Sequence, residues 1–162
     1  MKRFFYLLLI AAPLLGITSC NPEDDLPDAD LTVSYSGATE IDDIFYVVKG
    51  TRLSIDEISV KSADASKKAT IGASAYYWNY QYVGTTITEP FGMTFDTASM
   101  PTGDYMLQIN TTVYQEGKSV GIAYMSFPVK IVEAPDGVPG DVTGNGNVTP
   151  ESDIRAGALP TR

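Results

Sequence analysis

Few side chains of this sequence could perform chemistry. The chain of 162 residues holds one cysteine, at position 20, and no histidine, while Asp and Glu together number 20. The missing histidine excludes Ser-His-Asp and Cys-His catalysis and the usual zinc sites. A glycosidase needs two carboxylates across a cleft, but Asp and Glu concentrate here in expected turns and near the N-terminus. A formal charge of −9 also excludes a nucleic-acid binder, which needs a basic face. The sequence therefore predicts a protein that is not an enzyme.

The first twenty residues have the pattern of an export signal. Two basic residues precede an apolar run over residues 4–15, which is too short to span a membrane as a helix. The run ends in the letters ITSC at residues 17–20, which resemble a bacterial lipobox. The resemblance implies that residues 1–19 are a lipoprotein signal peptide and that Cys20 is the lipidation site, carrying acyl chains such as palmitate. Such chains hold a protein to a bilayer.

Residues 20–30 are expected to form a solvated tether, because their charge and proline content leaves too little apolar surface to bury. An acidic cluster directly after the cysteine resembles the export signal of surface lipoproteins in one Gram-negative phylum of gut-anaerobe type. That resemblance implies a lipid-anchored protein of the outer membrane, exposed at the cell surface.

The sequence pattern over residues 31–134 predicts an all-β domain. Apolar side chains recur at every second position, and turn sequences separate about seven such segments. The alternation reverses its phase at Asp56-Glu57, which predicts a β-bulge or a bend between sheets. About seven strands in about 100 residues favour an immunoglobulin-like antiparallel β-sandwich.

Two local features sharpen that prediction. Residues 102–105 resemble the tyrosine corner of immunoglobulin-like folds, in which the phenol, here of Tyr105, bonds back to nearby backbone. Trp78 lies where the core tryptophan of the third strand is expected. The segments around Pro90 and Pro101 resemble bacterial surface modules of the Ig-like or PKD-like kind. Such folds host many activities, so the resemblance implies an architecture and no function by itself.

The run of aromatic and amide residues over 76–82 is the strongest candidate binding segment. On one continuous strand its side chains would alternate between two faces. Two interpretations stay open: the set with Trp78 packs into the core, or part of the run forms an exposed aromatic platform for a sugar ring or a protein partner. The expected faces are Tyr76, Trp78, Tyr80 and Tyr82 on one side, and Tyr77, Asn79 and Gln81 on the other.

Residues 135–162 are expected to form a flexible tail rich in Gly, Asn and Pro. Residues 140–148 resemble the first half of a dockerin calcium loop. Position twelve of that loop is Ser152, which cannot replace the usual bidentate acid, so weak calcium binding at most is expected, with no other cofactor. The resemblance implies side-chain ligands at Asp141, Thr143 and Asn145 and a carbonyl ligand at Asn147.

The triplet Asp96-Thr97-Ala98 matches the O-glycosylation acceptor motif of the same phylum. A turn at this position would expose the hydroxyl of Thr97 for modification.

Together these patterns predict a non-enzymatic surface lipoprotein whose immunoglobulin-like domain is a binding or accessory module for a protein or a glycan. One alternative is a structural or adhesive subunit that assembles through edge strands. Another is calcium-dependent docking through the tail. The partner and the oligomeric state stay open.

Overall fold

The computed structural model describes residues 25–138 and 144–157, and these residues form an all-β structure, as predicted. A short 3-10 helix, η2 (Pro135–Gly137), follows the longest hairpin. The strands are β1 (Ala29–Ser36), β2 (Thr39–Ile41), β3 (Ile44–Val48), β4 (Arg52–Ser62), β5 (Ala69–Trp78), β6 (Gln81–Thr86), β7 (Met93–Asp96), β8 (Gly103–Gln115), β9 (Gly121–Val132), β10 (Asn145–Val148) and β11 (Asp153–Ala156).

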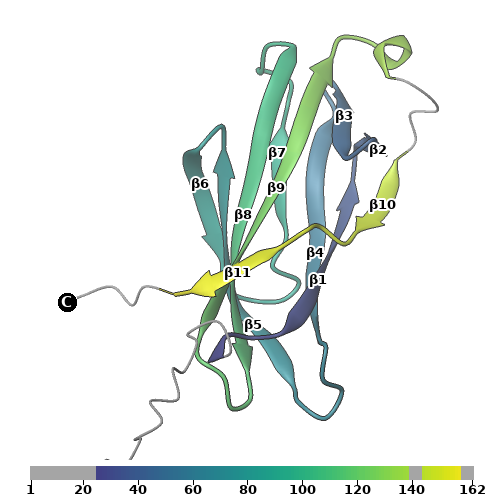
Figure 1. The fold of residues 1–162 in the computed structure, drawn as a ribbon. Helices are drawn as coiled ribbons and strands as arrows, with labels where there is room; N and C mark the ends of the chain where they lie inside the picture. Colours follow the sequence, from purple (N-terminus) through teal and green to yellow (C-terminus); the bar gives the residue numbers. More distant parts are fainter. Residues whose placement is uncertain (1–24, 139–143, 158–162) are drawn as a thin grey trace, which may run out of the picture.

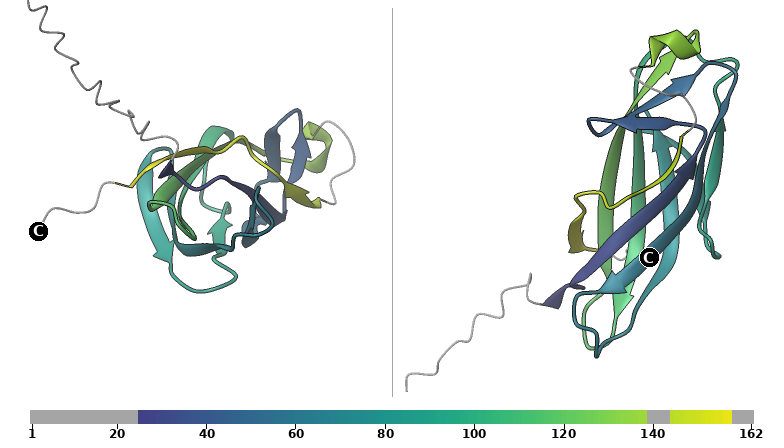
Figure 2. Two further views of the ribbon diagram at one scale, coloured as in Figure 1. Left: turned by 60° about the horizontal axis from the view of Figure 1, so that its bottom comes forward. Right: turned by 90° about the vertical axis from the view of Figure 1, so that its right-hand side faces the viewer.

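The strands form two sheets that pack face to face (Figures 1 and 2). One sheet has the order β10-β1-β4-β7, and the other has the order β2-β3-β9-β8-β5-β6, with β11 also beside β9. Strands β1, β4 and β7 correspond to A, B and E of the immunoglobulin fold, while β5, β8 and β9 correspond to C, F and G. The protein is therefore an immunoglobulin-like β-sandwich.

Alternate side chains of the facing strands fill the space between the sheets, as period-two patterning requires. Tyr35 of β1 contacts Phe45 of β3 in the opposite sheet, with ring centroids 4.5 Å apart. Burying this apolar surface supplies the main force that holds the two sheets together. The largest fully buried side chains are Leu31, Val33, Phe45, Val47, Leu53, Ile55, Tyr76, Leu107, Ile109, Val113, Met125 and Ile131.

Two local predictions are confirmed. Ser34 pairs with Glu57 and Tyr35 pairs with Ile55, so Asp56 is the additional residue of a β-bulge in β4. The hydroxyl of Tyr105 donates a hydrogen bond of 2.7 Å to the carbonyl of Pro101, which is the expected tyrosine corner. The bulge keeps β4 buried on its inner face on both sides of Asp56, and the corner fixes the start of β8.

The expected flexible tail is wrong for residues 144–157. β10 pairs with β1, and β11 pairs with the beginning of β9, so this segment runs across one side of the sandwich and joins both sheets (Figure 2). Val148 and Ile154 are half-buried against the core. The two strands satisfy main-chain groups that the edges of β1 and β9 would otherwise leave unpaired. Each is only four residues long and contains one large apolar side chain, which is too short a pattern to indicate a strand in the sequence.

The predicted tether also ends earlier than residue 30. The carbonyl of Asp25 accepts a hydrogen bond of 2.7 Å from the main chain of Ser119, in the turn between β8 and β9. The buried amide of Gln115 accepts a hydrogen bond from the main chain of Asp28 at 2.8 Å. These bonds fix the described chain from residue 25 onward at the β8–β9 end of the sandwich.

Candidate functional site

The sequence predicts one continuous strand for the aromatic run over residues 76–82. In the structure the run forms the two arms of a hairpin instead. β5 ends at Trp78 and β6 begins at Gln81, so Asn79 and Tyr80 form a two-residue turn. Their φ angles are 47° and 64°, the left-handed values that a type I′ turn requires. The sequence signal was weak because Tyr80 stands where such a turn usually has glycine.

Because of this turn, the side chains that share a face of the sheet differ from those expected for one continuous strand. Tyr82 pairs with Tyr77, and their rings meet edge to face at 5.7 Å on the outer side of the sheet. Tyr80 is 74% exposed and Tyr82 is 62% exposed. Tyr76, by contrast, is fully buried. The run thus supplies both core residues and exposed aromatic residues, divided differently from the expected faces.

Further outward residues of β8 and β9 extend this exposed aromatic pair. The register aligns Tyr82, Tyr77, Gln108 and Ser126 in one row across β6, β5, β8 and β9. The next row is Thr85, Ala75, Asn110 and Tyr124. We call these eight residues the neutral face, because none of them carries a charge.

Sequence reasoning missed the part of the neutral face that lies on β8 and β9. The alternation along β8 already indicates that Gln108 and Asn110 point away from the core. Their alignment with Tyr77 could not be read, because it depends on strand register. Tyr124 forms the border of the neutral face, where the guanidinium of Arg155 lies 5.6 Å from the centre of its ring.

The other predicted residues of the run have structural surroundings. The side-chain oxygen of Asn79 accepts a hydrogen bond of 2.8 Å from the main chain of Met106, which ties the turn to β8. Gln81 is exposed at the beginning of β6. Trp78 packs on Phe95 and Tyr105, with ring centroids 5.1 and 5.4 Å away, as expected for a core tryptophan. Its indole nitrogen is buried without a hydrogen-bond partner among the described residues.

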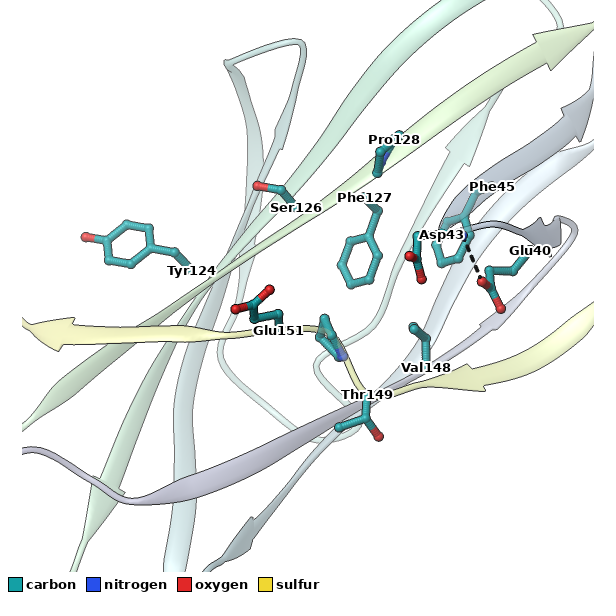
Figure 3. A pocket seen from close by; sticks show the side chains of 11 residues that line it. Glu40, Asp43, Phe45, Tyr124, Ser126, Phe127, Pro128, Val148, Thr149 and Glu151 are labelled. Carbon is teal, nitrogen blue, oxygen red and sulfur yellow. Dashed lines mark hydrogen bonds between the residues drawn. The ribbon is translucent and has the colours of Figure 1, made fainter.

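A pocket of about 370 Å³ lies beside β9, at the border of the neutral face (Figure 3). Its apolar lining includes Phe45 and Phe127, and the segment between β10 and β11 forms another wall. Three carboxylates surround it, from Glu40, Asp43 and Glu151. The pocket is therefore negative, unlike the neutral face.

The expected O-glycosylation site is wrong for the folded domain. Thr97 is fully buried, and its hydroxyl donates a hydrogen bond of 2.7 Å to the carbonyl of Thr51. The same oxygen accepts a hydrogen bond of 3.1 Å from the main chain of Gly50. The hydroxyl is thus used to close the turn after β7 against the turn before β4, and no modifying enzyme reaches it there.

The remaining predicted sites lie at the ends of the chain. Cys20, Asp141 and Thr143 are outside the described residues. Asn145 and Asn147 lie on β10, opposite Ser36 and Ser34 of β1. An extended strand spaces alternate residues along a line, whereas a calcium loop must curl them around one ion. The two asparagines are therefore not arranged as half of a calcium loop.

The described part of the chain, residues 25–138 and 144–157, contains no helix that is long and apolar enough to cross a membrane. Within the same residues, no three Asp, Glu, Cys or His side chains gather as metal ligands would.

No protein-family model and no curated protein matches the chain. Among solved structures, it is similar to the fibronectin(III)-like modules of CbhA from Clostridium thermocellum. The two share 10% identity with a TM-score of 0.42, over 67% of this chain and 48% of that one. The chain thus spans about half the length of that structure. The fold class of this chain follows from its own strand order, which is that of a β-sandwich of the immunoglobulin or fibronectin type III kind.

Proposed function

We propose that this protein is a non-enzymatic binding module of the cell surface, held by a lipid at Cys20, whose neutral face binds a neutral glycan. The observation that carries the proposal is the neutral face itself. In a chain with a net charge of −9, it is an uncharged surface that combines exposed aromatic rings with amide and hydroxyl side chains.

The chemistry of a sugar ring fits this combination. The C–H face of a pyranose packs against the flat face of an aromatic side chain. The rings of Tyr82 and Tyr80 are both largely exposed to solvent. The amides of Gln108 and Asn110 each offer both donors and acceptors to the sugar hydroxyls. A charged ligand would find no opposite charge on the neutral face, so the proposal is restricted to neutral glycans.

The position of the hairpin suits a lipid-anchored protein. β5 runs from Ala69, opposite Gln115, to Trp78, opposite Leu107. At about 3.3 Å per residue this distance is about 30 Å. The chain enters the domain at the β8–β9 turn, so the turn at Tyr80 lies at the opposite end of the sandwich from the proposed anchor. A binding surface there faces away from the membrane.

Affinity electrophoresis tests this proposal. The soluble chain, beginning at residue 25, is run in native gels that contain xylan, galactomannan or a soluble glucan. At least one polysaccharide should retard the wild type, and Tyr82→Ser or Gln108→Ala should weaken the retardation about tenfold. The control is Tyr114→Ser, because Tyr114 is exposed on β8 about 20 Å from Gln108. A wild type that no neutral polysaccharide retards contradicts the glycan proposal.

A second candidate function is assembly through β6. This strand is the edge of its sheet, and residues 81–86 contain no charge and no proline, the usual protections of a free edge. An unprotected edge pairs readily with another strand. If the chain assembles this way, light scattering after size-exclusion chromatography should show oligomers that Val83→Lys abolishes. A strict monomer at high concentration contradicts this second function.

A further inference from the structure

β9 has an interruption in its pairing along one edge. Residues 129–132 pair with β3, and residues 121–124 pair with β11. Between them, residues 125–128 have no strand of the described chain beside them on that edge. At about 3.3 Å per residue the opening is about 13 Å long.

The main chain of β9 directs into this opening N–H and carbonyl groups that have no hydrogen-bond partner among the described residues. The carbonyl of Val132 accepts a hydrogen bond from Lys49, which follows β3, and the carbonyl of Val120 accepts one from Gly157, which follows β11. The main-chain N–H and carbonyl groups of successive residues point alternately to the two edges of a strand. In β9 these groups point to this edge from the even-numbered residues. Ser126 therefore directs an N–H and a carbonyl into the opening. The next residue of that parity is Pro128, which contributes only a carbonyl.

The opening coincides with the pocket of Figure 3, which both Ser126 and Pro128 line. The carboxylates of Glu40, Asp43 and Glu151 border it, and none of them forms an ion pair with a described residue. Phe45 and Phe127 form its apolar floor. The pocket thus combines an open strand edge, an apolar surface and a concentrated negative charge.

We propose that this pocket binds an extended peptide segment of a partner protein that carries lysine or arginine. The segment adds to β9 as a short strand, and its main chain pairs with Ser126 and Pro128. The aliphatic stem of its basic side chain covers the apolar floor, while the cationic end reaches the carboxylates. The open edge selects extended main chain, and the three carboxylates select a cation and repel anions. This site borders the neutral face and shares Tyr124 and Ser126 with it. It uses the main chain of Ser126 and the three carboxylates, whereas the proposed glycan contacts are the rings of Tyr80 and Tyr82 and the amides of Gln108 and Asn110.

Fluorescence anisotropy with a labelled peptide Thr-Lys-Val-Arg-Thr tests the proposal. A triple variant neutralises the rim: Glu40→Gln, Asp43→Asn and Glu151→Gln. The matched control neutralises three exposed carboxylates elsewhere: Glu57→Gln, Asp104→Asn and Glu116→Gln. We expect the rim variant to bind the peptide about tenfold more weakly, since exposed charge pairs contribute modestly. The control variant should bind like the wild type, and so should Tyr82→Ser, which alters only the neutral face.

A second probe separates strand addition from simple charge attraction. The same peptide with methyl groups on alternate backbone nitrogens keeps its charge but cannot donate to the carbonyls of β9. It should bind at least tenfold more weakly than the unmodified peptide. Three results would each overturn the proposal: no binding of the basic peptide at millimolar concentration, equal weakening in both triple variants, or undiminished binding of the methylated peptide.

Discussion

Some residues of this domain adopt backbone conformations that their side chains disfavour. Tyr80 and Phe91 both have left-handed φ angles, of 64° and 60°. For Phe91 the surroundings explain the conformation: its ring is buried, and its carbonyl accepts hydrogen bonds from Tyr76 and Thr86. For Tyr80 the type I′ turn requires the conformation, but the exposed ring buries little surface that would compensate for having a side chain at this position. Strain without a packing reason is typical of functional positions, which supports a binding role for Tyr80.

Tyr76→Phe tests the bond to Phe91. The variant should lower the free energy of unfolding by about 1 kcal/mol at pH 7, because one buried hydrogen bond is lost. Burial raises the pKa of the Tyr76 phenol well above its ordinary value, although the neighbouring hydroxyl of Thr86 partly opposes this. The folded state therefore retains the proton more strongly, and the associated stability is full below pH 10 and lost as the pH rises above it.

Urea denaturation at several pH values from 7 to 11 measures both effects. The wild type should lose stability more steeply above pH 10 than Tyr76→Phe does. Parallel pH dependences of the two proteins would show that Tyr76 is not protected from ionisation by burial.

Among the strands, the sequence predicted those that have a long alternating pattern of apolar and polar residues. β8 alternates over Tyr105, Leu107 and Ile109, and its inner face followed from that pattern. The bulge at Asp56 was visible because it reverses the phase. The neutral face was not predictable, because register across four strands decides it. β10 and β11 were missed because a strand of four residues with one large apolar side chain is too short for a periodic signal.

Deleting residues 139–162 tests the role of these two strands. The deletion exposes the edges of β1 and β9 and removes the partly buried Val148 and Ile154. We expect the free energy of unfolding to fall by about 2 kcal/mol and the melting temperature to fall by about 5–10 °C. Deleting only residues 158–162 is the control and should change neither quantity. A melting temperature unchanged by the longer deletion would show that the segment is a dispensable tail.

The whole molecule combines an acidic body, a proposed lipid anchor and a proposed binding face at the opposite end. The N-terminal segment meets the β8–β9 turn through Asp25 and Ser119, while Tyr80 lies about 30 Å along β5 from that end. A negative body keeps such a protein soluble and limits contact with other acidic surfaces. The neutral face then remains available to an uncharged ligand.

Cys20→Ala tests the anchor. The wild type expressed in a Gram-negative host should partition into detergent and incorporate labelled palmitate, because acyl chains supply its membrane affinity. The variant should remain in the aqueous phase and incorporate no label. Detergent partitioning that persists in Cys20→Ala would contradict lipidation at this residue.

The central claim is that the neutral face and its turn bind a ligand, and Tyr80→Gly tests it most directly. Glycine adopts the left-handed conformation without strain, so the variant should be about 1 kcal/mol more stable than the wild type. The control is Asp43→Gly, a second left-handed turn residue with φ of 61°, which should gain less stability, because Asp adopts this conformation at a lower cost than Tyr. Binding of the retarding polysaccharide, measured by titration calorimetry, should weaken at least tenfold in Tyr80→Gly and remain unchanged in Asp43→Gly. A more stable Tyr80→Gly that binds the polysaccharide as well as the wild type does would contradict the account.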